Sequence, residues 1–60
     1  MKKTFMLEGE RITLHHAKEL FGERYLMVLA EAKRIYLRDP LRELNYMTRE
    51  GILTIWFQPD

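Results

Sequence analysis

Cysteine and serine are both absent from the 60 residues, and glycine and proline are scarce, with Gly 3 and Pro 2. Without cysteine there is no disulfide, no thiolate zinc site and no cysteine nucleophile. Without serine there is no serine-hydrolase chemistry, and no glycine-rich loop is present to hold a phosphate. No apolar run approaches membrane-spanning length. These absences predict a soluble, cytoplasmic protein that is not an enzyme and has neither a metal nor another cofactor.

The chain has room for one small domain. A domain of this size hides only about 60% of the surface of its unfolded chain. The composition is nevertheless 47% hydrophobic and 32% charged, which excludes a disordered chain. We therefore expect additional core to come from oligomerisation. The net charge of +1 excludes a protein that coats nucleic acid by bulk charge, so a nucleic-acid role requires local clustering of cations.

The first third of the chain has a clear order of elements. Residues 4–7 have a strand-like composition, a turn follows at Glu8-Gly9-Glu10, and residues 11–14 alternate, with Ile12 and Leu14 on one face. From Leu14 the apolar spacing becomes helical and continues to Phe21. Thr13 suits the N-cap of this helix and Gly22 its end.

Residues 25–38 allow two interpretations. Residues 25–30 are continuously apolar and residues 34–38 alternate, which would suit two strands of a hairpin with its tip at residues 31–33. The alternative is one helix over residues 23–38. Ala30 to Lys33 are good helix formers, and the tip has no glycine or asparagine for a tight turn, so local propensity slightly favours the helix.

Asp39-Pro40 then predicts a new element, because aspartate can cap a helix and proline suits its first position. We expect a short helix over residues 41–47, a turn over residues 48–51 and a strand over residues 52–57. The strand prediction rests on the β-branched and aromatic residues of that segment, and Pro59 ends it.

Few residues are candidates for chemistry. His15 and Glu19, four apart on a helix, could supply two metal ligands, but no third is evident nearby. Trp56 and Phe57 with Tyr36 and Tyr46 could form a stacking platform for single-stranded nucleic acid, although burial is the simpler use. Cations and polar groups near the predicted strand and short helix could share one surface, namely Lys2, Lys3, Arg11, Thr13, His15, His16, Lys18 and Arg24.

Residues 7–14 followed by a short helix ending in Leu20-Phe21-Gly22 resemble the opening of AbrB/SpoVT-like swapped-hairpin DNA-binding domains. In that family a Gly-Arg-(Val/Ile)-Thr-(Ile/Leu)-Pro strand leads into a short helix and then an apolar hairpin. The present chain differs in having Glu10 between Gly9 and Arg11, and His15 where the family has proline. The resemblance covers about residues 3–40, and it shifts the expectation for residues 25–37 from helix to hairpin.

The resemblance implies an α+β fold: a swapped-hairpin, β-barrel-like homodimer with one short helix per hairpin and a C-terminal strand. Residues 1–40 would form the DNA-binding domain, and residues 41–60 a segment that extends the dimer or binds a protein partner such as a toxin. The expected function is that of a dimeric transcription regulator or antitoxin that binds double-stranded DNA. Arg11 is the best candidate for contact with a base edge. The expected DNA contacts are Lys2, Lys3, Arg11, Thr13, His15, His16, Lys18 and Arg24.

Two other functions remain open. Residues 12–22 also resemble the first helix and the turn of a helix-turn-helix DNA-binding module, with residues 23–38 as its second helix. A different class is a small partner-binding protein without a nucleic-acid role, which would use residues 52–57 to add a strand to another chain.

Overall fold

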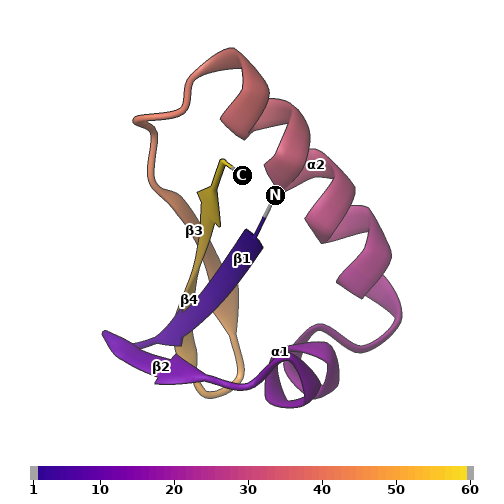
Figure 1. The fold of residues 1–60 in the computed structure, drawn as a ribbon. Coiled ribbons are helices and arrows are strands. Elements are labelled where there is room, and N and C mark those ends of the chain that lie inside the picture. The colour runs from indigo at the N-terminus through magenta and orange to yellow at the C-terminus, as the bar shows by residue number, and fades with distance from the viewer. Residues whose placement is uncertain (1, 60) are drawn as a thin grey trace.

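The computed structural model describes residues 2–59, which form a four-stranded sheet and two α-helices (Figure 1). The α+β class predicted from the sequence is confirmed. The elements in chain order are β1 (Lys2–Leu7), β2 (Glu10–Ile12), α1 (Leu14–Phe21), the 3-10 turn η1 (Gly22–Arg24), α2 (Tyr25–Arg38), β3 (Leu44–Thr48) and β4 (Gly51–Gln58).

The sheet has the strand order β2-β1-β4-β3, and every neighbouring pair is antiparallel. Two hairpins, β1–β2 and β3–β4, are joined through the central pairing of β1 with β4. Phe5 lies opposite Ile55 in this pairing, and Lys2 lies opposite Gln58. The two ends of the described chain are therefore neighbours in the middle of the sheet (Figure 1).

Both helices lie on one face of the sheet, and the core fills the space between these two layers (Figure 1). Alternation along the strands sends every second side chain to the helices. Nine hydrophobic residues are buried there: Phe5, Ala17, Leu20, Phe21, Tyr25, Ala32, Leu44, Leu53 and Ile55. The other face of the sheet carries no helix and leaves Met47, Ile52 and Trp56 exposed.

The predicted elements of the first third are confirmed. Helix α1 begins after Thr13, whose hydroxyl accepts a hydrogen bond from the His16 N–H at 3.1 Å. It ends at Gly22, whose φ of 59° is costly for other residues. The turn at Glu8 and Gly9, the turn before Gly51 and the C-terminal strand are also where the sequence predicts them.

The hairpin expected at residues 25–37 is wrong, because these residues form helix α2. The hairpin followed from the family resemblance, whereas local propensity favoured a helix. Tyr25 and Ala32, seven residues apart, lie on one side of α2 and are buried against the core. A period of 3.6 residues therefore outweighs the short alternation at residues 34–38. Residues 2–59 contain two α-helices and not the single short helix of the expected architecture.

The helix expected at residues 41–47 is also wrong, because Leu44–Thr48 form strand β3. Asp39-Pro40 ends α2 and does not begin a new helix. Leu44 lies opposite Ile55, and Thr48 lies opposite Gly51, so a two-residue turn joins β3 to β4. The pairing of β3 with β4 and the burial of Leu44 therefore outweigh the local preference of Asp39-Pro40 for a helix start.

Strand β4 is central and not a free edge. Leu53 to Ile55 have β1 on one side and β3 on the other. Adding residues 52–57 to a partner's sheet would require a free edge that these central residues lack. The division of the chain at residue 40 remains a prediction; within residues 2–59 both parts contribute to one sheet. No helix in this range is long and apolar enough to cross a membrane.

Candidate nucleic-acid interface

A hollow of the surface lies where strand β2 stops. β2 pairs only with Phe5, Met6 and Leu7, so the first half of β1 has no strand on that side within residues 2–59. The chain instead turns at Thr13 into α1. The result is an open groove of about 1140 Å³, which we call the basic groove, lined by Lys2, Lys3, Thr4, Phe5, Arg11, Ile12, Thr13, Leu14, His16 and Gln58.

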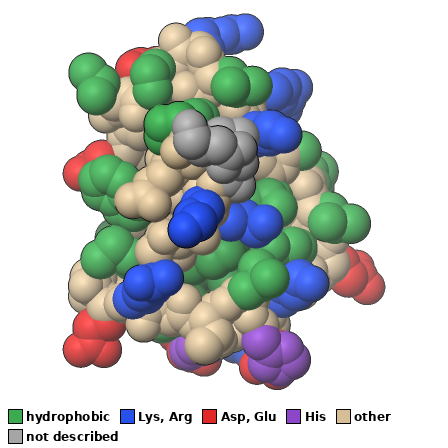
Figure 2. All heavy atoms as spheres, viewed as in Figure 1, with side chains coloured by type: hydrophobic (Ala, Val, Ile, Leu, Met, Phe, Trp, Pro, Cys, Tyr) green, Lys and Arg blue, Asp and Glu red, His purple; other side chains and the backbone are tan. Residues whose placement is uncertain are grey.

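The residues that line the basic groove include three permanent cations and no acid. Lys2, Lys3 and Arg11 are exposed, and His16 is half-buried. In the same view as Figure 1, Lys and Arg side chains gather over the middle of the face, and the acidic side chains lie towards its periphery (Figure 2). A chain with a net charge of only +1 thus concentrates positive charge in one place.

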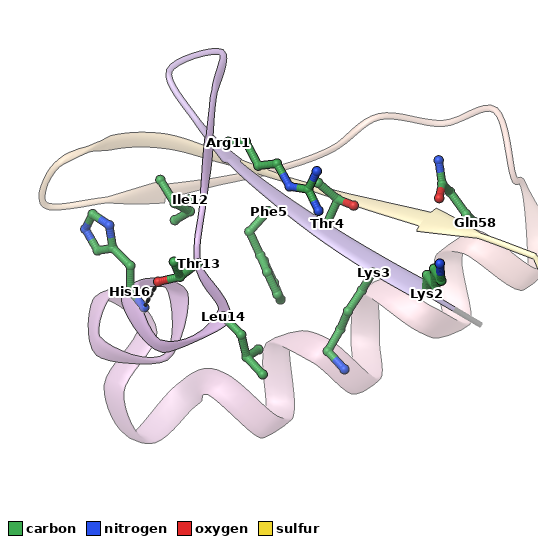
Figure 3. A pocket seen from close by; sticks show the side chains of 10 residues that line it. All are labelled: Lys2, Lys3, Thr4, Phe5, Arg11, Ile12, Thr13, Leu14, His16 and Gln58. Carbon is green, nitrogen blue, oxygen red and sulfur yellow. Dashed lines mark hydrogen bonds between the residues drawn. The ribbon is translucent and has the colours of Figure 1, made fainter.

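The cations lie on both sides of β1 (Figure 3). Arg11 pairs with Met6 across the strands and extends over the open face of the sheet towards Thr4. Lys3 points to the other side, towards the helices, as do Phe5 and Leu14. An extended, negatively charged chain along this edge would therefore meet cations on either side and apolar groups between them.

The N-terminus of α1 opens into the same groove. Thr13, Leu14 and His16 all line it, and the first turn of α1 contains no acidic residue. The N-terminus of a helix carries the positive end of the helix dipole and unpaired N–H groups. The groove therefore has a further source of positive potential besides its side chains.

His16 lines the groove and also contacts the turn between β3 and β4. Its Nε2 lies 3.1 Å from Oε1 of Glu50, which is in the turn between β3 and β4. The two residues are 34 positions apart in the sequence. This contact holds the start of α1 against the β3–β4 hairpin, and it places one carboxylate beside the groove.

The structure brings together some of the predicted DNA contacts and separates others. Lys2, Lys3, Arg11, Thr13 and His16 line the basic groove. His15 lies outside it, with Nε2 3.0 Å from Oε1 of Glu19. Lys18 is also outside, with its Nζ 5.5 Å from the centre of the Tyr25 ring, and Arg24 lies in η1. Residues 2–59 contain no group of three His, Cys, Asp or Glu residues that could hold a metal ion.

The predicted aromatic platform does not form. Trp56 is 53% exposed on the open face of the sheet. Phe57, the next residue, points to the helices, and its ring lies 5.2 Å from that of Tyr36. Tyr46 packs edge-on against Phe21, with ring centres 5.9 Å apart. One aromatic ring is therefore available for stacking on the open face, and the other three contribute to packing.

Thr4, Gln58 and Glu50 belong to the site or its surroundings, and sequence reasoning missed them. Thr4 and Gln58 both line the groove because β1 pairs with β4, although the two strands are far apart in the sequence. Glu50, in the β3–β4 turn, lies within hydrogen-bond distance of His16 at the start of α1. These are long-range pairings, for which hydrophobic periodicity gives no signal.

Comparison with known proteins identifies no relative: no family model, no curated protein and no solved structure matches this chain. The resemblance to swapped-hairpin domains therefore remains a prediction. Its strand and short helix are present, and the hairpin that should follow them is replaced by α2.

Proposed function

We propose that this protein binds double-stranded DNA through the basic groove, as a homodimer, and acts as a transcription regulator or an antitoxin. The observation that carries the proposal is the acid-free lining of the groove, with Lys2, Lys3 and Arg11 around one end of β1. Phosphate contacts supply most of the affinity of such proteins, and local cations are what they require. The N-terminus of α1 adds a favourable site for an anion beside these cations.

The groove offers two kinds of contact. Lys2, Lys3 and the start of α1 suit phosphates, which position a protein on the duplex without reading its sequence. Arg11 lies on the open face of the sheet, and its guanidinium can bind the two acceptors of a guanine edge in the major groove. Thr4 lies in the direction in which Arg11 extends, so both side chains would face the same base pairs.

A duplex titration at about 50 mM and 200 mM salt tests the proposal. We expect binding that weakens steeply with salt, because neutralised phosphates release counterions. Arg11→Ala should cost about 1–3 kcal/mol, and Lys3→Ala should weaken all sequences to a similar degree. Absence of binding at the lower salt concentration would favour the partner-binding function.

Helix α2 provides the matched control. Lys33 and Arg34 are exposed on this helix and do not line the groove. Lys33→Ala and Arg34→Ala should change DNA affinity less than Arg11→Ala does. The opposite order would favour the helix-turn-helix reading, in which α2 is the second helix and enters the major groove.

A further inference from the structure

Strand β3 forms one edge of the sheet and lacks two common protections against pairing with another chain, charge and proline. Within residues 2–59 it pairs only with β4. Its sequence, LNYMT, contains no charge and no proline. The opposite edge is guarded, because β2 has only three residues, including Glu10 and Arg11, and the uncovered part of β1 carries lysines. Short edge strands and charged edges are the devices by which proteins prevent unwanted strand pairing.

We propose that β3 pairs antiparallel with the β3 of a second copy of this chain, about a two-fold axis that passes beside Tyr46. In this register Leu44 lies opposite the partner's Thr48, and Asn45 opposite the partner's Met47. Residues that face the helices then pair with residues that face the helices, as a continuous sheet requires. The interface is isologous, since each contact occurs twice.

The charges that flank β3 match this register. Arg42-Glu43 precede the strand and Arg49-Glu50 follow it. With the axis at Tyr46, the strand end that carries Arg42 and Glu43 lies beside the partner's β3–β4 turn, which carries Arg49 and Glu50. Two clusters of opposite charges would then flank an uncharged centre. Moving the axis to Asn45 or Met47 also keeps the faces, but it shifts Glu43 by two residues relative to the partner's turn, next to the partner's Met47 in the first case and beyond the turn in the second, and the charge pairing is lost.

The exposed surface also favours a partner. The chain exposes 4696 Å², whereas a folded monomer of 7.3 kDa exposes about 4200 Å² by the usual scaling with mass. A five-residue edge buries little area, so we expect a dimer at the weak end of specific interfaces, with a dissociation constant in the micromolar range. The basic groove lies at the other edge of each sheet and stays open.

Pairing through β3 would give one eight-stranded sheet with a basic groove near each end. The two copies of β2 would be seven strand spacings apart, about 34 Å along the sheet at about 4.8 Å per strand. This is close to one turn of B-DNA, the usual separation of half-sites for a dimer. Sheet twist would rotate the two ends of this sheet relative to each other.

Sedimentation equilibrium over about 1–500 µM tests the interface with charge reversals. Glu43→Arg places an arginine beside the partner's Arg49, and Arg49→Glu places a glutamate beside the partner's Glu43. Each single reversal should weaken the dimer about tenfold, because two exposed pairs change from attraction to repulsion. The double variant restores opposite charges and should return to within about threefold of wild type. Lys33→Glu, an exposed reversal on α2, is the matched control and should leave the dimer unchanged.

A monomeric wild-type protein over the whole range would overturn the proposal. So would a dimer that ignores the single reversals, or a double variant weaker than both singles. Amide hydrogen exchange gives a second measurement: alternate residues of β3 direct their N–H groups outwards and should become protected as concentration rises. A dimer that forms with no new protection in β3 would place the interface elsewhere. The proposal rests on the dimer of the proposed function and needs no DNA, so its failure and a failure to bind DNA are separate results.

Discussion

Glu8 and Ile52 bind each other through two hydrogen bonds although they are 44 residues apart. The N–H of Ile52 donates to Oε2 of Glu8 at 2.7 Å, and the N–H of Glu8 donates to the carbonyl oxygen of Ile52 at 2.9 Å. Glu8 has a φ of 50°, which is uncommon outside glycine. These two hydrogen bonds hold the β1–β2 turn against the start of β4.

Glu8→Ala should destabilise the protein by about 1–2 kcal/mol, because the N–H of Ile52 loses a charged acceptor. Glu8→Gln keeps an acceptor oxygen at the same distance from the backbone and should cost less than half as much. Urea denaturation followed by circular dichroism measures both. Equal losses in the two variants would show that the charge, and not the hydrogen bond, stabilises the turn.

Gly51 is required for two reasons, and Gly9 for one. Both have positive φ, 127° and 86°. A Cβ at Gly51 would also lie 2.7 Å from Cγ of Glu8, whereas a Cβ at Gly9 would meet nothing within 4 Å. We expect Gly51→Ala to cost at least about 1 kcal/mol more than Gly9→Ala, since only the first adds a clash to the backbone strain. In a Glu8→Ala background, which removes Cγ, this difference should disappear.

The hydroxyl of Tyr46 is buried and, within residues 2–59, has no hydrogen-bond partner. Burial raises the pKa of this phenol; Glu31 raises it further and Arg42 lowers it. An unsatisfied buried hydroxyl costs stability, so Tyr46→Phe should stabilise the protein by about 1 kcal/mol at neutral pH. A loss of stability would show that the hydroxyl has a partner.

The pKa of Tyr46 also predicts the alkaline limit of the fold. Because the folded pKa lies above the ordinary tyrosine pKa of 10.0, the folded state retains its proton more strongly than the unfolded chain. The contribution of Tyr46 to stability should be fully present below pH 10 and be lost as the pH rises through the folded pKa. Tyr46→Phe should fall less steeply over the same range in thermal melts. Identical pH profiles would assign the alkaline loss to other groups, among them Tyr25, whose pKa burial also raises.

Local signals predicted the first third of the fold well, because residues next to each element mark where it begins and ends. Thr13 caps α1 and Gly22 ends it, and both roles depend on side-chain chemistry that the sequence displays directly. Arg11 was placed correctly on the polar side of its strand for the same reason. Only the position of Thr13 and Arg11 in one groove with Gln58 was beyond the reach of the sequence.

The errors lie where tertiary pairing overrides local signals. Leu44–Thr48 became a strand because β4 is available to pair with it, a fact that Asp39-Pro40 cannot convey. In residues 25–38 the local physics indicated the helix, and the family resemblance led away from it. The candidate site was predicted only in part. The β1–β4 pairing places Lys2 opposite Gln58, and Arg11 on β2 lines the same groove. Lys18 on α1 and Arg24 in η1 do not line this groove.

Nuclear magnetic resonance of the labelled protein with a short DNA duplex tests the central claim most directly. If the basic groove binds DNA, addition of duplex at low salt should shift the amide signals of residues 2–4, 11–14 and 16 most. The signals of α2 and of the β3–β4 turn should move less, and Arg11→Ala should reduce the shifts. Shifts centred on α2, or no shifts at millimolar duplex, would contradict the account.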